Sequence, residues 1–350
     1  MRRAAEDFGC RLVTTVWNDD AKIDGPALAA FWEADVILFE CAGARSIPSP
    51  ESFGEVPVVY IDTDPSGLPA SVPCVSCDGV ETAALAVRQL VARRLAAYVY
   101  VDAPVDFYWS RKRREPFVAS LRKKGADVRV LKGCFWPSAD LESIRCLGAE
   151  LAALPRPLGV FACNDLQASA VLTAAQQAGL SVPKDLSVIG VDDDVSICEA
   201  THPPLTSIRM DFVRSGVVVV ELALKRLKTR RRQNLRATYD ALGLMPRASC
   251  SGVSRLGDAR VMAALTSLRL NLTSPTAIRE AAAAMGCSVR MAELRFKAVT
   301  GHSLRETLRR FRAEQARRIR KLRPDLSPDD LARAVGYTNR SALWKALKSH

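Results

Sequence analysis

Residues 158–194 read LGVFACNDLQASAVLTAAQQAGLSVPKDLSVIGVDDD. This stretch begins with an apolar run, Leu158–Cys163, and ends with a second one, Leu186–Val191. Between them lies Asp165–Gly179, which has the length and pattern of an amphipathic helix. Short apolar runs separated by a helix are typical of parallel strands joined by a right-handed crossover. The stretch therefore predicts two buried parallel strands and the helix that connects them.

The same alternation extends outward from residue 11 to residue 194. Further strands are predicted over Leu12–Val16, Val36–Phe39, Val56–Asp62, Tyr98–Val101 and Val128–Leu131. Further helices are predicted over Glu81–Arg94, Glu115–Lys124 and Leu141–Leu154. Regular alternation of this kind predicts mainly parallel sheets with helices on both faces. A helix through about Lys228, a charged stretch at 229–236 and a strand-like Leu242–Met245 follow.

Polar residues stand at the ends of the two central strands. Asn164 and Asp165 follow the first, and the acidic run Asp192–Asp194 follows the second. Open parallel sheets bind ligands beyond the carboxyl ends of their strands, and amide and carboxylate groups can hold adjacent hydroxyls of a polyhydroxyl ligand. On its own, Asn164 is more typical of a helix N-cap. The acidic run also admits a magnesium or phospho-aspartate interpretation, which the absence of a glycine-rich phosphate loop disfavours.

The cysteines and histidines give little support for a metal or a catalytic site. Most of the ten cysteines lie inside apolar stretches, as free thiols do in a reducing compartment. Cys74 and Cys77 form one C-x-x-C pair, but no second pair and no histidine stands at matching spacing. The three histidines offer no pairing of a nucleophile with a base. We therefore expect no metal, no cofactor and no enzymatic activity.

The chain carries no pattern of membrane insertion or secretion. No apolar run reaches the ~20 residues that a membrane span needs, and the first residues lack the apolar core of a signal peptide. We therefore expect a cytoplasmic protein that does not bind membranes.

The net charge of +12 is concentrated at one end of the chain. Residues 251–350 hold 20 of the 50 Lys and Arg residues but only 8 of the 38 Asp and Glu residues, so residues 1–250 are neutral. Lys and Arg neutralise phosphates and release condensed counterions, so a basic domain beside a neutral one points to a polyanion. A solvated basic surface gives the same composition.

Two helix-turn-helix patterns follow residue 255. The first has helices over Thr276–Met285 and Val289–Thr300 around a turn at Gly286–Ser288. A long helix over Ser303–Leu322 precedes the second, in which Ser327 is the expected N-cap. Ala292, Phe296 and Val299 form the inward stripe of the first reading helix, and Leu343 and Leu347 form that of the second. The residues left to contact double-stranded DNA are Arg290, Glu293, Lys297, Asn339, Arg340 and Lys345.

The first part of the chain resembles a known family. The segments Phe161–Asp165, Ala178–Asp185, Gly190–Asp193 and Pro203–Ile208 resemble the effector domain of LacI/GalR repressors, most of all the variant of xylose operon regulators, in which an AraC-type domain follows. The resemblance implies an α/β periplasmic-binding-protein-like sensor with two lobes of parallel sheet, three crossing strands and a monosaccharide between the lobes. Asn164 and Asp192 match sugar-contacting positions, and Arg113 matches a ligand-binding Arg, although Pro116 replaces a family Gly. We expect Trp109 to stack on a face of the sugar.

The last part resembles the AraC/XylS family. The motifs Arg295–Lys297, Thr300–Ser303, Leu308–Arg317 and Ala334–Tyr337 carry this resemblance, which covers 260–350 and implies an all-α double helix-turn-helix domain. We therefore expect a sugar-binding domain over 1–252 and a DNA-binding domain over 253–350. Against the two families, a first strand before Gly9 and a last helix after Ser349 are expected to be missing.

Two functions remain open at this point. The first is a homodimeric transcription regulator that binds specific DNA under the control of a pentose such as xylose. The second is a truncated sugar-sensing or dimerising protein without productive DNA binding.

Overall fold

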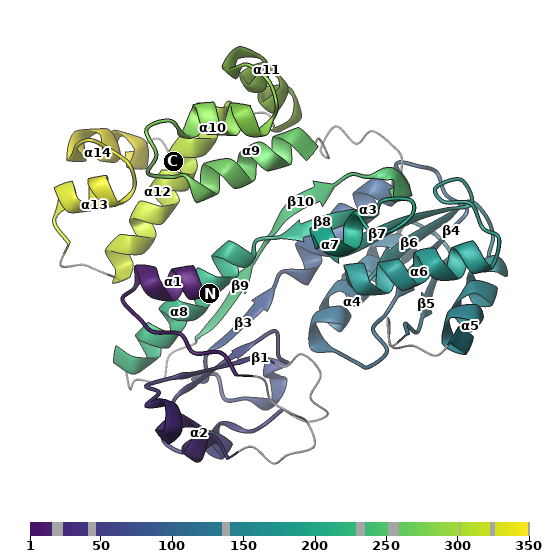
Figure 1. The fold of residues 1–350 in the computed structure, drawn as a ribbon, viewed down its shortest axis with the longest axis horizontal. Coiled ribbons are helices and arrows are strands. Elements are labelled where there is room, and N and C mark those ends of the chain that lie inside the picture. Colours follow the sequence, from purple (N-terminus) through teal and green to yellow (C-terminus); the bar gives the residue numbers. More distant parts are fainter. Residues whose placement is uncertain are drawn as a thin grey trace. The chain divides into compact units, whose positions relative to one another are not determined.

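The computed structural model describes residues 1–15, 24–40, 47–134, 141–228, 235–250, 259–300, 302–322 and 326–348 (Figure 1). The chain divides into two compact units, one of Met1–Ala241 with Arg247–Gly252 and one of Leu242–Pro246 with Val253–His350. The predicted domain boundary at 252/253 and the arginine-rich stretch at 229–234 lie outside the described residues. Among the described residues, no helix has the length and apolar character needed to span a membrane.

The first lobe contains a four-stranded parallel sheet in the order β1-β2-β3-β9. Its strands are β1 (Ile37–Glu40), β2 (Val58–Ile61), β3 (Cys74–Cys77) and β9 (Arg236–Tyr239). Phe53, Val58, Tyr60 and Cys74 form a buried cluster beside this sheet. The helices of this lobe are α1 (Arg2–Asp7), α2 (Gly25–Trp32) and α8 (Phe212–Lys228). Ala4 and Ala5 of α1 pack against Val220 of α8.

The second lobe contains a six-stranded sheet in the order β10-β8-β7-β6-β4-β5. Its strands are β4 (Ala97–Val101), β5 (Val128–Leu131), β6 (Leu158–Ala162), β7 (Leu186–Asp192), β8 (Thr206–Met210) and β10 (Ala241–Met245). The pairs from β8 to β5 are parallel. Its helices are α3 (Gly79–Val91), α4 (Tyr108–Arg122), α5 (Leu141–Ala152), α6 (Asp165–Gln177) and the short α7 (Val195–Cys198). Every residue of β4 and β6 is buried, which explains their continuous apolar sequence.

The chain passes between the two sheets three times. It leaves the first sheet after β3, returns to it after β8, and leaves it again between β9 and β10. The predicted α/β architecture with two lobes of parallel sheet and three crossings is confirmed (Figure 1).

Several predicted elements differ from the structure. Leu12–Thr15 form no strand: among the described residues no strand pairs with this segment, and Val13 is 38% exposed. Helix α4 begins at Tyr108 rather than at Glu115, since Arg and Lys are good helix formers and Arg111–Arg114 continues the helix despite its polarity. Pro116 lies inside this helix. Strands β3, β8 and β9 were not predicted, because they are short and carry polar residues.

The described residues of the second unit from 259 onward are helical, as predicted. Its helices are α9 (Ala259–Leu270), α10 (Ala277–Ala284), α11 (Val289–Thr300), α12 (Leu304–Leu322), α13 (Pro328–Ala334) and α14 (Arg340–Lys348). Ala292 and Phe296 are fully buried against α9, α10 and α12, and Val299 packs on the same cluster. Leu343 is buried with Leu331 and Val335, with Leu347 beside them. Both predicted inward stripes are thus confirmed, and Ser327 caps α13 by accepting from the Asp330 amide at 3.1 Å.

Candidate functional site

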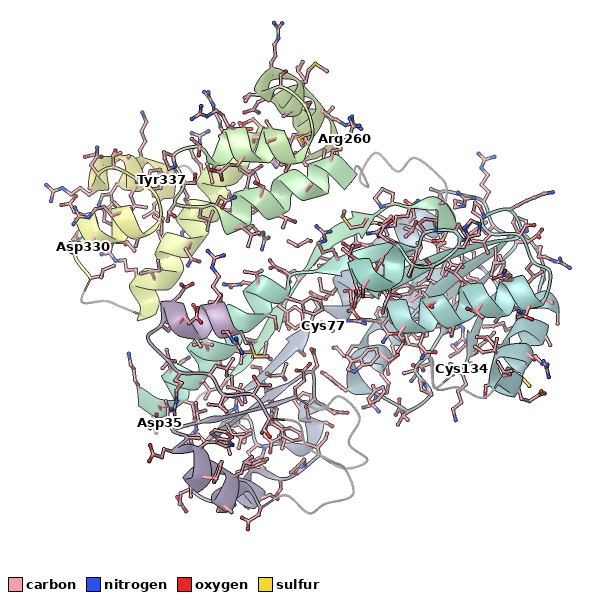
Figure 2. The ribbon with its side chains drawn as sticks, viewed as in Figure 1. Asp35, Cys77, Cys134, Arg260, Asp330 and Tyr337 are labelled. Atoms are coloured by element: carbon pink, nitrogen blue, oxygen red, sulfur yellow. The ribbon has the colours of Figure 1, made fainter. Side chains whose placement is uncertain are left out.

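A buried arginine joins strand ends of both lobes. Arg113 of α4 is 4% exposed, and its Nη1 donates to the carbonyl oxygen of Cys163, directly after β6, at 2.5 Å. Its Nη2 lies 3.9 Å from Sγ of Cys77 and 3.8 Å from Oδ1 of Asp192. Cys77 is the last residue of β3 and is labelled in Figure 2. Within the described part of the chain, Nε of Arg113 is buried without a hydrogen-bond partner. The Nε–H group of Arg113 is therefore an unpaired donor close to strand ends of both sheets.

Asp192 is the last residue of β7 and has a left-handed backbone, with φ of 107°. Its side chain is 34% exposed. Desolvation raises the pKa of Asp192 to about 6, Arg113 opposes this shift, and the negative charges of Asp62 and Asp194 add to it. The predicted pair Arg113 and Asp192 is thus brought together by the fold.

Asp62, directly after β2, is a further candidate for the site and was not predicted from the sequence. Its Oδ1 accepts from the Cys77 amide at 2.9 Å, and its Oδ2 accepts from the hydroxyl of Tyr239, the last residue of β9, at 2.7 Å. Asp62 also has a positive φ of 50°. Its position directly after a predicted strand, like that of Asp192, was the available signal.

The other two predicted ligand-binding residues flank Arg113. Asn164 caps α6, because its Oδ1 accepts from the Gln167 amide at 2.9 Å, so the N-cap interpretation is confirmed. Trp109 lies one turn before Arg113, whose guanidinium carbon is 5.2 Å from the centre of the indole ring. The ring of Phe107 stacks on Trp109 at a centroid distance of 5.2 Å. Trp109 therefore already has an aromatic and a cationic neighbour.

The acidic run Asp192–Asp194 does not act as one cluster. Asp193 is fully buried and forms ion pairs with Arg209 at 2.5 Å and with Arg247 at 2.8 Å. Asp194 caps α7 by accepting from the Ser196 amide at 2.9 Å. Because the three carboxylates have separate partners, a shared magnesium ion is not favoured.

The two cysteines of the C-x-x-C pair are also separated by the strand on which they lie. Cys74 and Cys77 are three residues apart on β3, so their side chains point to opposite faces of the strand. Burial raises the pKa of Cys77 to about 11, so this thiol is protonated at neutral pH. Among the described residues, no three His, Cys, Asp or Glu side chains are grouped as metal ligands are.

The first reading helix, α11, carries three of the residues predicted to contact DNA and exposes two of them. Arg290 and Lys297 are exposed. Glu293 is half-buried, and its Oε2 accepts from the Leu304 amide at 3.0 Å, which caps the start of α12. Glu293 thus differs from the prediction of a purely outward residue, because the following helix turns back over it.

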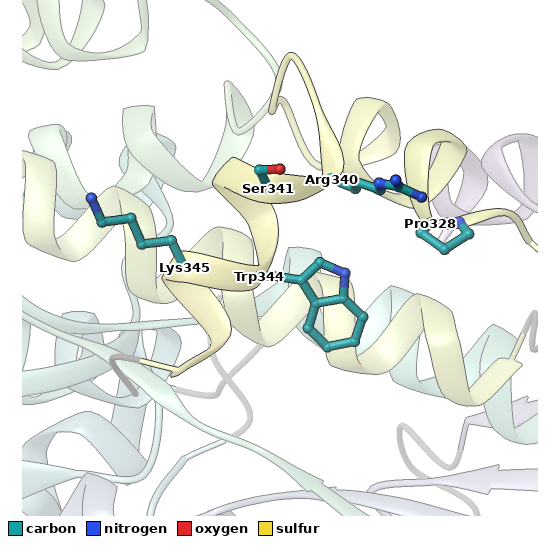
Figure 3. Close-up of a pocket in the computed structure, with 5 residues that line it drawn as sticks. All are labelled: Pro328, Arg340, Ser341, Trp344 and Lys345. Atoms are coloured by element: carbon teal, nitrogen blue, oxygen red, sulfur yellow. The ribbon is translucent and has the colours of Figure 1, made fainter.

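The second reading helix, α14, exposes Asn339, Arg340 and Lys345. Asn339 Oδ1 accepts from the Ala342 amide at 3.0 Å, so Asn339 also caps this helix. A shallow pocket between α13 and α14 is shown in Figure 3 and is lined by Pro328, Arg340, Ser341, Trp344 and Lys345. The indole of Trp344 is 41% exposed, with the guanidinium of Arg320 over its ring at 5.1 Å.

Comparison with protein families agrees with this division. Residues 81–250 match the model of a periplasmic binding protein-like domain, and residues 281–350 match that of a helix-turn-helix domain. The chain therefore carries a periplasmic-binding-protein-like domain followed by an AraC-type helix-turn-helix domain, as predicted.

Individual proteins match over parts or all of the chain. The "HTH-type transcriptional repressor PurR" of Mannheimia succiniciproducens is 28% identical over 51% of this chain and 52% of its own length. The "Ribose operon repressor" of Bacillus subtilis is 27% identical over 65% of this chain and 69% of its own length. The structure of the "xylose-binding transcription activator xylR" covers 97% of this chain and 93% of its own, with a TM-score of 0.53 and 18% identity. The chain spans about half to three fifths of the length of the PurR repressors that it matches.

Proposed function

We propose that this chain is a sequence-specific transcription regulator that binds double-stranded DNA under the control of a small sugar. The observation that carries the proposal is Arg113, a buried arginine that contacts strand ends of both lobes and keeps one donor unpaired. The second supporting feature is the pair of helix-turn-helix motifs in a basic unit. The effector is a pentose such as xylose, and the regulator works in the cytoplasm as a homodimer, without a catalytic step.

The ligand-binding residues are Trp109, Arg113, Asn164 and Asp192, joined by Asp62. Arg113 donates to sugar oxygens, and Asp192 and Asp62 accept from sugar hydroxyls. The side-chain amide nitrogen of Asn164 supplies a further donor, because its capping bond uses only the oxygen. Trp109 contacts the less polar face of the sugar ring. A set that combines donors, acceptors and an aromatic ring suits a neutral polyhydroxyl ligand better than an apolar one.

The DNA-binding residues are Arg290, Glu293, Lys297, Asn339, Arg340 and Lys345. Arg and Lys on the outer faces of α11 and α14 contact guanine edges and phosphates in the major groove. Glu293 also holds the start of α12 in place, since its Oε2 accepts from the Leu304 amide. The sugar changes the affinity for DNA by favouring one of two arrangements of the lobes.

A thermal-shift screen against xylose, arabinose, ribose and glucose tests the sugar site. We expect one pentose to raise the melting temperature of the full chain, because a ligand that binds only the folded state stabilises it. The Asp192→Asn variant should lose that shift. The Glu150→Gln variant, which removes an exposed carboxylate elsewhere, should keep it. A full shift in Asp192→Asn contradicts the assignment of the site.

Fluorescence anisotropy with DNA from directly upstream of the chain's own gene tests the DNA-binding function. We expect tighter binding to this duplex than to a scrambled one, with an affinity that falls steeply as salt rises. Equal affinity for both duplexes at low salt contradicts sequence-specific regulation. Sugar binding together with that result supports the alternative, a sensing protein without productive DNA binding.

A further inference from the structure

Helix α11 exposes an unusual pair of apolar side chains on its outer face. Met291 is 56% exposed and Leu294 is 61% exposed, although Ala292 and Phe296 of the same helix are completely buried. Met291 and Leu294 are three residues apart, so they are neighbours on the helix surface. The small Ala298, also exposed, extends this strip by one turn. The strip Met291–Leu294–Ala298 therefore lies on the side of α11 that faces away from the core of its unit.

Cationic residues border the strip. Arg290 precedes Leu294 by four residues and Lys297 follows it by three, so all three side chains project from the same side of the helix. Both cations are exposed. Leu294 thus stands between two positive charges on a surface where a Leu gains nothing from the folded chain alone.

We infer that Leu294 and Met291 read thymine, by packing against its 5-methyl group in the major groove. This inference rests on the proposed function, because it makes α11 a helix that enters DNA. The major-groove edge of thymine is the one base edge that offers a methyl group, and apolar side chains recognise it by contact. Arg290 and Lys297 beside the strip would pair with phosphates or guanines while Leu294 packs on the methyl group.

A second copy of the chain is a poorer occupant of the same strip. In a twofold contact the same surface meets itself, so each Leu294 would bring the Arg290 and Lys297 of both copies together. Burying like charges costs free energy, whereas a polyanion offsets both cations. Charge complementarity therefore selects DNA as the occupant.

The experiment compares the full chain's affinity for two upstream duplexes that differ only in thymine methylation. One contains thymidine and the other contains deoxyuridine, which keeps the base pairing and lacks the methyl group. We expect the thymidine duplex to bind more tightly by about fourfold for each contacted methyl group, equivalent to ~0.8 kcal/mol of buried apolar surface.

Variants assign that difference to α11. Leu294→Ala and Met291→Ala should each reduce the ratio of the two affinities toward one while keeping the salt dependence. Leu270→Ala, which truncates a 42% exposed leucine at the end of α9, is the matched control and should keep the ratio. All three positions are exposed, so the variants should fold.

Three results would overturn the inference. They differ in whether they also overturn the proposed function. Salt-dependent, sequence-specific binding with equal affinity for both duplexes overturns the thymine reading and leaves the proposed function standing. Failure to distinguish the thymidine duplex from a scrambled one overturns both. Concentration-dependent dimerisation that Leu294→Ala abolishes, with an unchanged ratio of affinities, assigns the strip to a second copy.

Discussion

Asp192, Asp193 and Asp194 stand side by side in the sequence and perform three different tasks. Asp192 pairs with Arg113, Asp193 with Arg209 and Arg247, and Asp194 caps a helix. Asp192 and Asp193 both have positive φ, so the backbone turns sharply and directs successive carboxylates apart. The sequence predicted that all three carboxylates lie at a strand end. Their different directions depend on backbone angles that the residue types alone do not determine.

Replacing Asp193 by Asn should destabilise the chain more than any exposed carboxylate change. Asn tolerates the left-handed backbone at this position, so the change removes mainly the charge. Arg209 and Arg247 then lose a fully buried anion. We expect a loss on the order of 3 kcal/mol in the free energy of unfolding, less than a fully buried pair would show, because Arg209 is partly exposed.

Urea unfolding followed by circular dichroism measures this loss. Asp127→Asn is the control, since its ion pair with Arg129 is exposed on both sides and contributes less than about 1 kcal/mol. Similar losses for the two variants would show that Asp193 is not a structural anchor.

Asp165 should make the chain less stable as the pH rises toward neutrality. Burial raises the pKa of Asp165 to about 7, although Ser207 and the Asp194 amide hydrogen-bond to it. A carboxyl group with a raised pKa in the folded state binds its proton more tightly there than in the unfolded chain. Its stabilising contribution is therefore present at low pH and is lost as the pH rises from about 4 through 7. Asp192, with its pKa near 6, adds to the same trend.

Melting temperatures between pH 5.5 and 8 test this sign. Carboxylates with lowered pKa values, such as Asp64, titrate below this window. The melting temperature of the wild-type chain should fall across the window, and Asp165→Asn should flatten the curve. Parallel curves for the two proteins would exclude Asp165 as the cause.

Among the helices and strands, the most completely buried strands were predicted from the sequence. Strands β4, β6 and β7 are almost wholly buried, so their apolar runs were visible in the sequence. Strand β9 is partly exposed and starts with Arg236, which donates to backbone carbonyls of Leu68 and Pro69. Strand β9 pairs with β3, whose residues are more than 150 positions away in the sequence. A local sequence pattern holds no information on such a distant pairing.

The contact between α3 and α4 should fail if Gly79 gains a side chain. A Cβ atom at Gly79 would lie 2.2 Å from the carbonyl oxygen of Lys112, next to Arg113. Gly79→Ala must therefore push α4 away from α3, at a cost of about 1–3 kcal/mol, and move Arg113 out of position. We expect a lower melting temperature together with a weaker response to sugar.

Gly67→Ala is the matched control, since a Cβ atom there meets nothing within 4 Å. It should leave both the melting temperature and the sugar response unchanged. Normal sugar binding by Gly79→Ala would show that the position of α4 does not govern the ligand site.

For the whole molecule, the sequence predicted the two parts of the chain more completely than the residues of the candidate ligand site. The charge excess after residue 250 and the change from alternating strands to helices both marked two functional parts. The candidate ligand site draws on β2, β3, β6, β7, β9 and α4, whose residues come together only through the three crossings. Asp62 and Tyr239, 177 positions apart, could not be joined by any motif.

Sugar and DNA should therefore change each other's affinity by the same factor in the full chain. Both orders of binding end in the same ternary complex, so the coupling free energy is identical along the two routes, and factors of about 5 to 150 are typical. Anisotropy titrations of DNA with and without xylose give one factor, and calorimetric titrations of xylose with and without DNA give the other. Asp192→Asn should bring both to one. If wild-type protein binds both ligands yet shows no coupling, sugar control of DNA binding is refuted while each site stands.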